Sequence, residues 1–287
     1  MRPKELKTKI FLDSCDPKET KEIISILGFL DGQTTNPTLV TKNPYAQDRL
    51  LKGDKFSKEE IFDFYKKNII EISKLIPDGS VSVEVYADEN TKAEEMFQQG
   101  EEMFRWIPNA HIKYPITKVG LLVAEKSIKN DMRVNMTLCF TQEQAGAVYS
   151  ATIGAKKNNV FVSPFIGRLD DIGINGMSLI ENIIKMYEKG DGHVEVLSAS
   201  VRNMTHFMAS LALGVDIITA PIAILKEWGE LSMPIPKNFS EYDFSSLKNI
   251  SYENIDLNKH WENFDITNEL TEKGIKRFAS DWNALIK

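Results

Sequence analysis

Short runs rich in β-branched and aromatic residues recur along the chain and alternate with longer stretches whose hydrophobic residues follow a helical period. We expect eight strands, at residues 9–13, 32–36, 80–85, 110–114, 133–138, 160–165, 194–200 and 216–220. Regular alternation of eight strands with helices predicts an α/β fold of the (β/α)₈, or TIM barrel, type. An open, doubly wound sheet is the alternative fold for the same pattern.

The helical stretches have recognisable ends. Asp16, Ser57 and Thr141 each precede helical spacing and offer a side-chain oxygen that suits a helix start. Gly28 and Gly214 stand where helices should stop, because glycine readily adopts the left-handed conformation that ends many helices. The sequence therefore indicates where helices begin and end between the predicted strands.

The chain changes character after the eighth strand. Residues 222–228 have the spacing of a short helix, and residues 230–265 are polar and irregular. Residues 266–286 recover an amphipathic helical stripe. We expect one domain over residues 1–287, in which 230–265 wraps the surface and the C-terminal helix docks on the barrel or on another subunit of a homo-oligomer.

Polar residues recur on one face of the predicted strands. In the third strand, Glu84 lies on the face opposite the valines. In the fourth, Lys113 opposes Ile112 and Tyr114. In the fifth, Asn135 and Thr137 share the polar face. The polar side chains of successive strands should thus meet inside the barrel, near the strand ends.

Composition narrows the setting. The chain has 287 residues, 42% hydrophobic content and two cysteines, too few for a disulfide framework. No apolar run approaches the roughly 20 residues that span a bilayer, and the first residues lack the apolar stretch of an export signal. We expect a protein of the reducing cytoplasm, with no membrane partner.

Charge and motifs exclude several functions. A net charge of −6 argues against a broad nucleic-acid surface but permits a local anion pocket. None of the four histidines stands in a zinc motif, and no glycine-rich phosphate loop is present. We therefore expect neither a metal nor a nucleotide cofactor.

Lys113 is the most informative residue for chemistry. A buried ammonium must lose its proton or find a counter-charge, and a neutral amine can attack a carbonyl group. Taken alone, Lys113 is also compatible with a structural cation paired to a carboxylate, which Glu84 would supply. Both interpretations stay open at this level.

A series of motifs in a fixed order resembles the transaldolase family. It runs from about the tenth residue to the 220–221 pair, and the terminal helix is similar too. The motifs are Ile10-Phe11-Leu12-Asp13, Thr34-Thr35-Asn36-Pro37, Glu84-Val85, Ile112-Lys113-Tyr114-Pro115, Asn135-Met136-Thr137-Leu138, Ser163-Pro164-Phe165-Ile166-Gly167-Arg168 and Ser198-Ala199-Ser200-Val201-Arg202-Asn203.

The resemblance implies a catalytic role for four residues. Lys113 would condense with the C2 carbonyl of a ketose, so that the iminium accepts electrons when the C3–C4 bond breaks. Glu84 and Thr137 would position a water that shuttles protons during this condensation. Asp13 would accept the proton of the C4 hydroxyl and return it to the acceptor aldehyde.

The resemblance also implies the substrate contacts. Asn36 and Asn135 would bind the hydroxyls of the dihydroxyacetone unit, and Ser163 would line the same wall. Arg168 and Arg202, with Ser200, would hold the phosphate group of a sugar phosphate. We therefore expect transfer of a dihydroxyacetone unit between ketose and aldose phosphates, as in the pentose phosphate pathway.

Two alternatives remain. Fructose-6-phosphate aldolases, which release free dihydroxyacetone, tend to carry Gln, Tyr and Lys where this chain has Glu84, Phe165 and Arg202. The lack of a phenolic hydroxyl at Phe165 favours an intermediate that waits for an acceptor aldehyde. From a different class, the chain is compatible with a non-catalytic barrel that binds sugar phosphates through its arginines.

Overall fold

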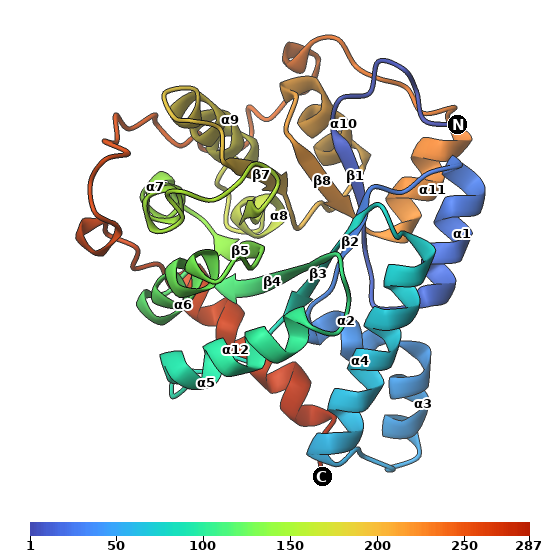
Figure 1. The fold of residues 1–287 in the computed structure, drawn as a ribbon. Coiled ribbons are helices and arrows are strands. Elements are labelled where there is room, and N and C mark those ends of the chain that lie inside the picture. The colour runs from blue at the N-terminus through green and yellow to red at the C-terminus, as the bar shows by residue number, and fades with distance from the viewer.

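The computed structural model describes residues 1–287 and contains a closed barrel of eight parallel strands in sequence order (Figure 1). The (β/α)₈ prediction is confirmed. The strands are β1 (Lys9–Asp13), β2 (Gly32–Thr34), β3 (Ser80–Glu84), β4 (Ala110–Pro115), β5 (Val134–Cys139), β6 (Val160–Pro164), β7 (Val194–Ser198) and β8 (Ile217–Ala220).

Helices surround the barrel, and none combines the length and hydropathy needed to cross a bilayer. They are α1 (Pro17–Leu27), α2 (Pro37–Lys42), α3 (Pro44–Leu51), α4 (Lys58–Leu75), α5 (Ala93–Phe104), α6 (Lys118–Lys129), α7 (Gln142–Ala151), α8 (Ile166–Asp170), α9 (Gly176–Tyr187), α10 (Met204–Leu213), α11 (Ile222–Glu230) and α12 (Glu269–Ala284).

The predicted helix ends are confirmed. The side chains of Asp16, Ser57 and Thr141 accept backbone hydrogen bonds at the first turns of α1, α4 and α7. Gly28 and Gly214 end α1 and α10 in the left-handed conformation, with φ of 77° and 69°. Local sequence thus sets these boundaries.

Two strands end two residues earlier than the pattern predicts. β2 stops at Thr34 because Asn36 caps α2, where its side chain accepts from the Leu39 amide at 3.0 Å. β7 stops at Ser198 because the chain turns at Ser200, whose φ is 60°. Each early end places a polar residue at the barrel mouth rather than within the sheet.

Strand parity sorts the side chains as expected. Glu84 pairs in register with Lys113, and Lys113 with Asn135, so these polar residues form neighbouring positions around the barrel. Tyr114 points the other way, toward the helices, where its hydroxyl lies 3.2 Å from Ser127 Oγ on α6. An added Cβ at Gly100 on α5 would lie 2.0 Å from the same hydroxyl, so Tyr114 fits tightly between the two helices.

Aromatic rings fill the amino-terminal half of the barrel. Phe161 meets Phe11 edge-on, with ring centroids 6.1 Å apart, and stacks on His111 at 4.0 Å. These side chains are almost completely buried. The interior is therefore packed at this level.

The segment between α11 and α12 runs along the outside of the barrel, beside α7 and α9 (Figure 1). It contains only two short 3₁₀ helices, η1 (Phe239–Glu241) and η2 (Trp261–Asn263). Asn182 donates to the Ile250 carbonyl at 2.9 Å, and Gln142 accepts from the Glu253 amide at 2.8 Å. Polar helix residues thus tie this irregular backbone to the barrel.

The C-terminal helix α12 docks on its own chain, against α2 and the end of β5. Thr271 Oγ1 donates to the Leu138 carbonyl at 3.0 Å. Leu138 has a positive φ of 61° and lies in an irregularity of the β5–β6 pairing. The helix is therefore anchored at a break in the barrel wall.

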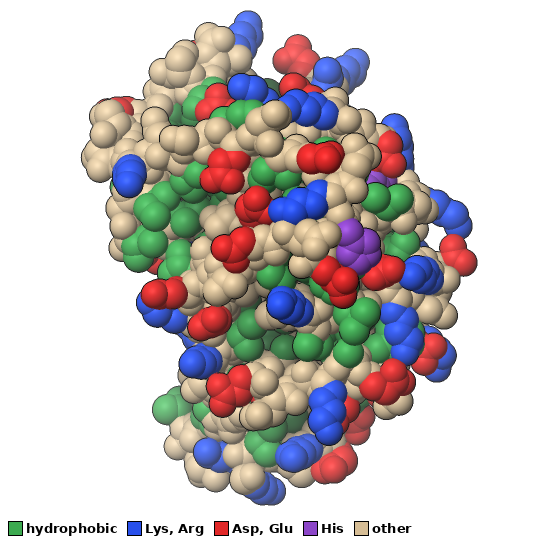
Figure 2. All heavy atoms as spheres, turned by 90° about the vertical axis from the view of Figure 1, so that its left-hand side faces the viewer, with side chains coloured by type: hydrophobic (Ala, Val, Ile, Leu, Met, Phe, Trp, Pro, Cys, Tyr) green, Lys and Arg blue, Asp and Glu red, His purple; other side chains and the backbone are tan.

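Figure 2 shows the side of the molecule that lies at the left of Figure 1. Basic and acidic side chains are interspersed on this face, and neither kind gathers into a broad patch. The interspersion agrees with the small net charge of −6.

Candidate active site

A cavity of about 360 Å³ opens at the carboxyl ends of the strands. Chemistry in a (β/α)₈ barrel is ordinarily located at this end. Most of the site residues predicted from the sequence line it, namely Asp13, Asn36, Lys113, Ser163, Phe165, Arg168, Ser200 and Arg202. Residues far apart in the sequence are thus gathered around one space.

Lys113 reaches this cavity from β4, although only 3% of the residue is exposed. Its Nζ lies 2.8 Å from Glu84 Oε2 and donates to the Thr35 carbonyl at 3.0 Å. The register of β3 and β4 places Glu84 directly beside it. The amine therefore has a carboxylate partner, and Lys113 also borders the cavity.

The carboxyl group of this pair has a perturbed pKa. Burial raises the pKa of Glu84, even though the charge of Lys113 acts in the opposite direction. The structure thus shows a buried ion pair in which the carboxyl group takes up a proton more readily than an exposed glutamate does.

Asp13 stands at the end of β1 and lines the same cavity. Thr34 Oγ1 donates to Asp13 Oδ1 at 2.7 Å, and Asp16 rather than Asp13 caps α1. Burial raises the pKa of Asp13, while Lys113 and the Thr34 hydrogen bond act to lower it. A cavity-lining carboxyl with a raised pKa that does not cap a helix is suited to proton transfer.

Asn135 and Thr137 lie behind the cavity wall and are completely buried. Asn135 donates to Ser82 Oγ at 3.0 Å and accepts from Ser163 Oγ at 2.6 Å, so its amide is engaged on both sides. Thr137 Oγ1 has no hydrogen-bond partner in the protein. The structure therefore brings Ser163 to the cavity surface, with Asn135 supporting it from behind.

Asn36 has two tasks. Its side-chain oxygen caps α2, as the Asn-Pro sequence allows, and the residue lines the cavity as well. Since the oxygen is committed to the Leu39 amide at 3.0 Å, the side-chain nitrogen is the group left for a ligand.

Arg168 lies between two aromatic rings. Its guanidinium carbon is 5.2 Å from the centre of the Phe165 ring and 5.3 Å from that of Phe278 on α12. The side chain forms no ion pair with a carboxylate, and burial lowers its pKa. A half-buried arginine without a carboxylate partner has the chemistry to bind an anion.

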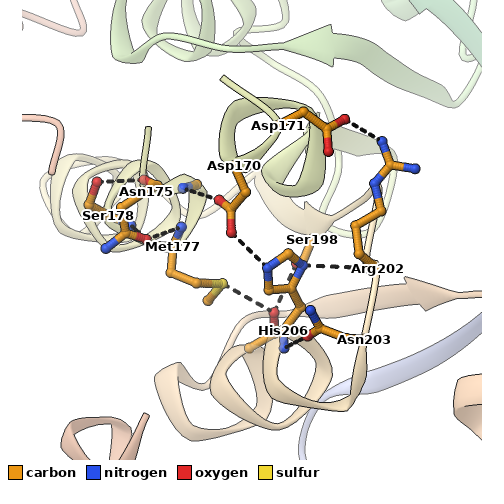
Figure 3. A network of polar contacts seen from close by, with 11 residues as sticks. Asp170, Asp171, Asn175, Met177, Ser178, Ser198, Arg202, Asn203 and His206 are labelled. Atoms are coloured by element: carbon orange, nitrogen blue, oxygen red, sulfur yellow. Dashed lines mark hydrogen bonds and ion pairs between the residues drawn. The ribbon is translucent and has the colours of Figure 1, made fainter. Parts of the chain in front are cut away.

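Arg202 belongs to a polar network with Asp171 and His206 (Figure 3). Its guanidinium donates to Asp171 Oδ2 at 2.9 Å, and its amide donates to His206 Nδ1 at 3.3 Å. His206 Nε2 lies 2.8 Å from Asp170 Oδ2, at the end of the helix that carries Arg168. The network thus fixes the two arginine-bearing segments relative to each other.

Close backbone contact between these segments depends on Gly167. Its amide donates to the Ser200 carbonyl at 3.1 Å. An added Cβ would lie 2.3 Å from that oxygen and 2.5 Å from Arg202 Cγ. Glycine is therefore the residue that fits here.

Comparison with known proteins identifies the family. A family model described as Transaldolase/Fructose-6-phosphate aldolase matches residues 10–287. The chain belongs to this family. The resemblance inferred from the motifs is confirmed at that level, and it supports an enzyme of the aldolase or transaldolase type.

Named relatives extend over almost the whole chain. "Probable transaldolase" from Brucella ovis is 38% identical over 277 residues, or 96% of each chain. "Probable transaldolase" from Dehalococcoides mccartyi is 33% identical over 279 residues, 97% of this chain and 100% of the relative. A solved structure of KGPDC from Streptococcus mutans covers 79% of this chain and 99% of its own, with 10% identity and a TM-score of 0.45, too low to carry an argument.

Some cavity residues of this transaldolase/fructose-6-phosphate aldolase family member are not predicted from the sequence. Lys42 at the end of α2 and Arg277 on α12 both line the cavity, and so does Thr219 on β8. The period of β8 was a signal for Thr219, whereas surface charges on helices carry no local sign that they face a cavity. No three His, Cys, Asp or Glu side chains are grouped as metal ligands.

Proposed function

We propose that this member of the family is a transaldolase that moves a dihydroxyacetone unit between sugar phosphates through a Schiff base on Lys113. The observation that carries the proposal is the enclosed Lys113 amine, which lines the cavity with Glu84 at 2.8 Å. An amine in this position can become neutral and reach a carbonyl carbon.

The first half of the reaction forms the covalent bond. Lys113 Nζ attacks C2 of a ketose phosphate, the carbonyl oxygen gains a proton, and loss of water leaves an iminium ion. Glu84, whose pKa is raised by burial, is placed to hold and return a proton at Nζ. The unpartnered Thr137 hydroxyl is suited to orient the water that connects these steps.

Cleavage then uses the carboxylate of Asp13. It takes the proton of the C4 hydroxyl, the C3–C4 electron pair moves into the iminium, and an aldose phosphate leaves. The enamine that remains on Lys113 attacks the carbonyl carbon of an acceptor aldose phosphate, and Asp13 returns the proton to the new hydroxyl. Hydrolysis of the iminium releases the new ketose phosphate and restores the amine.

The phosphate group is assigned to the arginine side of the cavity. Arg168 has no carboxylate partner, and Arg202 is paired only with the exposed Asp171. Guanidinium groups present paired donors that match phosphate oxygens. The partners implied are sedoheptulose 7-phosphate, fructose 6-phosphate, erythrose 4-phosphate and glyceraldehyde 3-phosphate.

Phe165 favours transfer over simple cleavage. It lines the cavity, and its ring carries no acidic hydrogen that could protonate the enamine and release dihydroxyacetone. Glu84 and Arg202 also favour transfer, because the aldolases tend to carry Gln and Lys at these positions.

A coupled assay tests this choice. We expect glyceraldehyde 3-phosphate to appear from fructose 6-phosphate only when erythrose 4-phosphate is present as acceptor. Steady turnover without an acceptor, with free dihydroxyacetone accumulating, would instead identify an aldolase. Sugar-phosphate binding without any turnover would identify a non-catalytic barrel.

A further inference from the structure

The C-terminal helix brings a third arginine to the cavity. Arg277 lies on α12 and lines the same space as Arg168 and Arg202, which follow β6 and β7. Its side chain is 63% exposed, so its guanidinium is accessible to a dissolved ligand. Three elements distant in the sequence thus present guanidinium groups to one space.

The position of α12 relative to Arg168 is fixed by close packing. The Phe278 ring lies 5.3 Å from the Arg168 guanidinium carbon. An added Cβ at Gly274 would lie 2.7 Å from an Arg168 nitrogen and 2.6 Å from a Leu138 methyl group. The helix therefore forms part of the wall around Arg168.

Only one of the three arginines lacks a carboxylate partner. Arg202 pairs with Asp171 at 2.9 Å and Arg277 lies 3.8 Å from Asp281, whereas Arg168 has none. All three line one cavity, and the pKa of Arg168 is lowered first by burial and then by the like charges of Arg277 and Arg202. A bound anion would relieve this repulsion, because each guanidinium would then face a negative charge.

We propose that Arg277 is a third ligand of the substrate phosphate, supplied by the C-terminal helix. The proposal rests on the proposed function for the identity of the ligand as a sugar phosphate. In consequence α12 contributes to selectivity for phosphorylated over unphosphorylated sugars.

Lys276 provides a matched control. It is the neighbouring cation on α12, it is exposed, and it does not line the cavity. Lys276→Gln and Arg277→Gln therefore make the same change in net charge on the same helix turn. Arg277→Lys keeps the charge but loses the forked geometry.

The experiment compares these variants with fructose 6-phosphate and with fructose as donor, at fixed acceptor concentration. We expect Arg277→Gln to raise KM for fructose 6-phosphate about tenfold, as for loss of one charged hydrogen bond, with kcat within about twofold. Turnover of fructose should be unaffected, Lys276→Gln should match the parent, and Arg277→Lys should restore part of the affinity. Equal effects of the two Gln variants, or no effect of either, would overturn the proposal.

Calorimetric titration with inorganic phosphate gives a readout independent of turnover. Arg277→Gln should weaken phosphate binding relative to Lys276→Gln, even if no ketose phosphate reacts. Failure of the proposed chemistry is then recognised by absent turnover in the parent, whereas failure of the Arg277 assignment is recognised by equal phosphate affinity in both Gln variants.

Discussion

The two ends of the barrel both contain a cavity and buried polar groups, but they differ in how far those groups find partners within the protein. The cavity at the amino-terminal end is the larger, about 740 Å³ against about 360 Å³ at the carboxyl end. Volume alone would therefore direct attention to the wrong end.

Polar groups at the amino-terminal end are satisfied by the protein. Lys9 Nζ lies 2.8 Å from Glu195. Arg133 donates to the carbonyls of Pro108 and Ala110, at 2.6 and 2.8 Å. The ring nitrogens of His111 are likewise bonded on both sides. These side chains therefore have structural contacts at this end of the barrel.

At the carboxyl end two groups lack such partners. The Arg168 side chain has no carboxylate partner, and Thr137 Oγ1 is buried without a hydrogen-bond partner in the protein. Buried polar groups are ordinarily paired, so exceptions mark places where a ligand is expected. The carboxyl end is distinguished not by cavity size but by a cavity-lining arginine, Arg168, that has no ion-pair partner.

The comparison predicts opposite outcomes for two lysines. Lys113→Met should lower kcat at least about a thousandfold, because it removes the proposed nucleophile. Lys9→Met should leave kcat within about twofold but lower the free energy of unfolding by about 1–2 kcal/mol, since Glu195 loses its partner at a partly exposed site. Steady-state kinetics and urea denaturation check both. A Lys9→Met variant that folds stably and fails to turn over would break the comparison.

The comparison also predicts different effects for two arginines, one on KM and one on stability. Arg168→Gln is expected to raise KM for fructose 6-phosphate about 10- to 100-fold, as a charged phosphate contact is lost. Arg133→Gln should lower Tm, because the Pro108 and Ala110 carbonyls lose a donor, and should leave KM unchanged. If Arg133→Gln altered KM as strongly, the ligand would have to be sought at the amino-terminal end.

His111 gives a pH-dependent test of stability. Burial lowers its pKa from 6.5 to about 3, so between these values the unfolded chain binds a proton that the folded chain rejects. Its contribution to stability is present above 6.5 and is lost as pH falls toward about 3. In His111→Gln, Tm should depend less on pH in this range, with kcat near neutral pH unaffected. An unchanged slope would show that His111 does not govern this dependence.

The smallest expected effect concerns the pH profile of kcat/KM, which should depend on Asp13 at the carboxyl end of the barrel. The proposed base Asp13 must be ionised to act, so its raised pKa should shift the acid limb of the kcat/KM profile above the range of an ordinary carboxyl. Thr34→Val removes a hydrogen bond that lowers this pKa, and the limb should move to higher pH. Thr219→Val leaves the Asp13 bond in place and should move it less. A limb that stays fixed in Thr34→Val would remove Asp13 from the role of base.

Much of this architecture is predictable from sequence, because strand and helix periods are local properties. Strand parity placed Glu84 and Lys113 on one face, and the register of β3 and β4 then sets them side by side. Strand parity predicts which face of the sheet a residue occupies. It does not predict how far the residue lies from the barrel mouth or which neighbours form hydrogen bonds with its polar atoms. Asn135 illustrates the limit, since its amide is bound by Ser82 and Ser163.

Other features depend on tertiary packing alone. Arg277 reaches the cavity only because α12 docks across the end of β5 in the same chain. The Asp171 contact of Arg202 likewise joins two loops that no short-range pattern relates. Side chains on helix surfaces become site residues through such packing, which the period of the helix does not encode.

Chemical trapping at the enclosed amine is the most direct test. The protein is incubated with fructose 6-phosphate, reduced with borohydride, digested and mapped by mass spectrometry, with Lys113→Met as the matched control. We predict a single reduced adduct on Lys113 that is absent from the variant. An adduct on another cavity lysine such as Lys42, or no adduct under conditions of turnover, would contradict a Schiff base at Lys113.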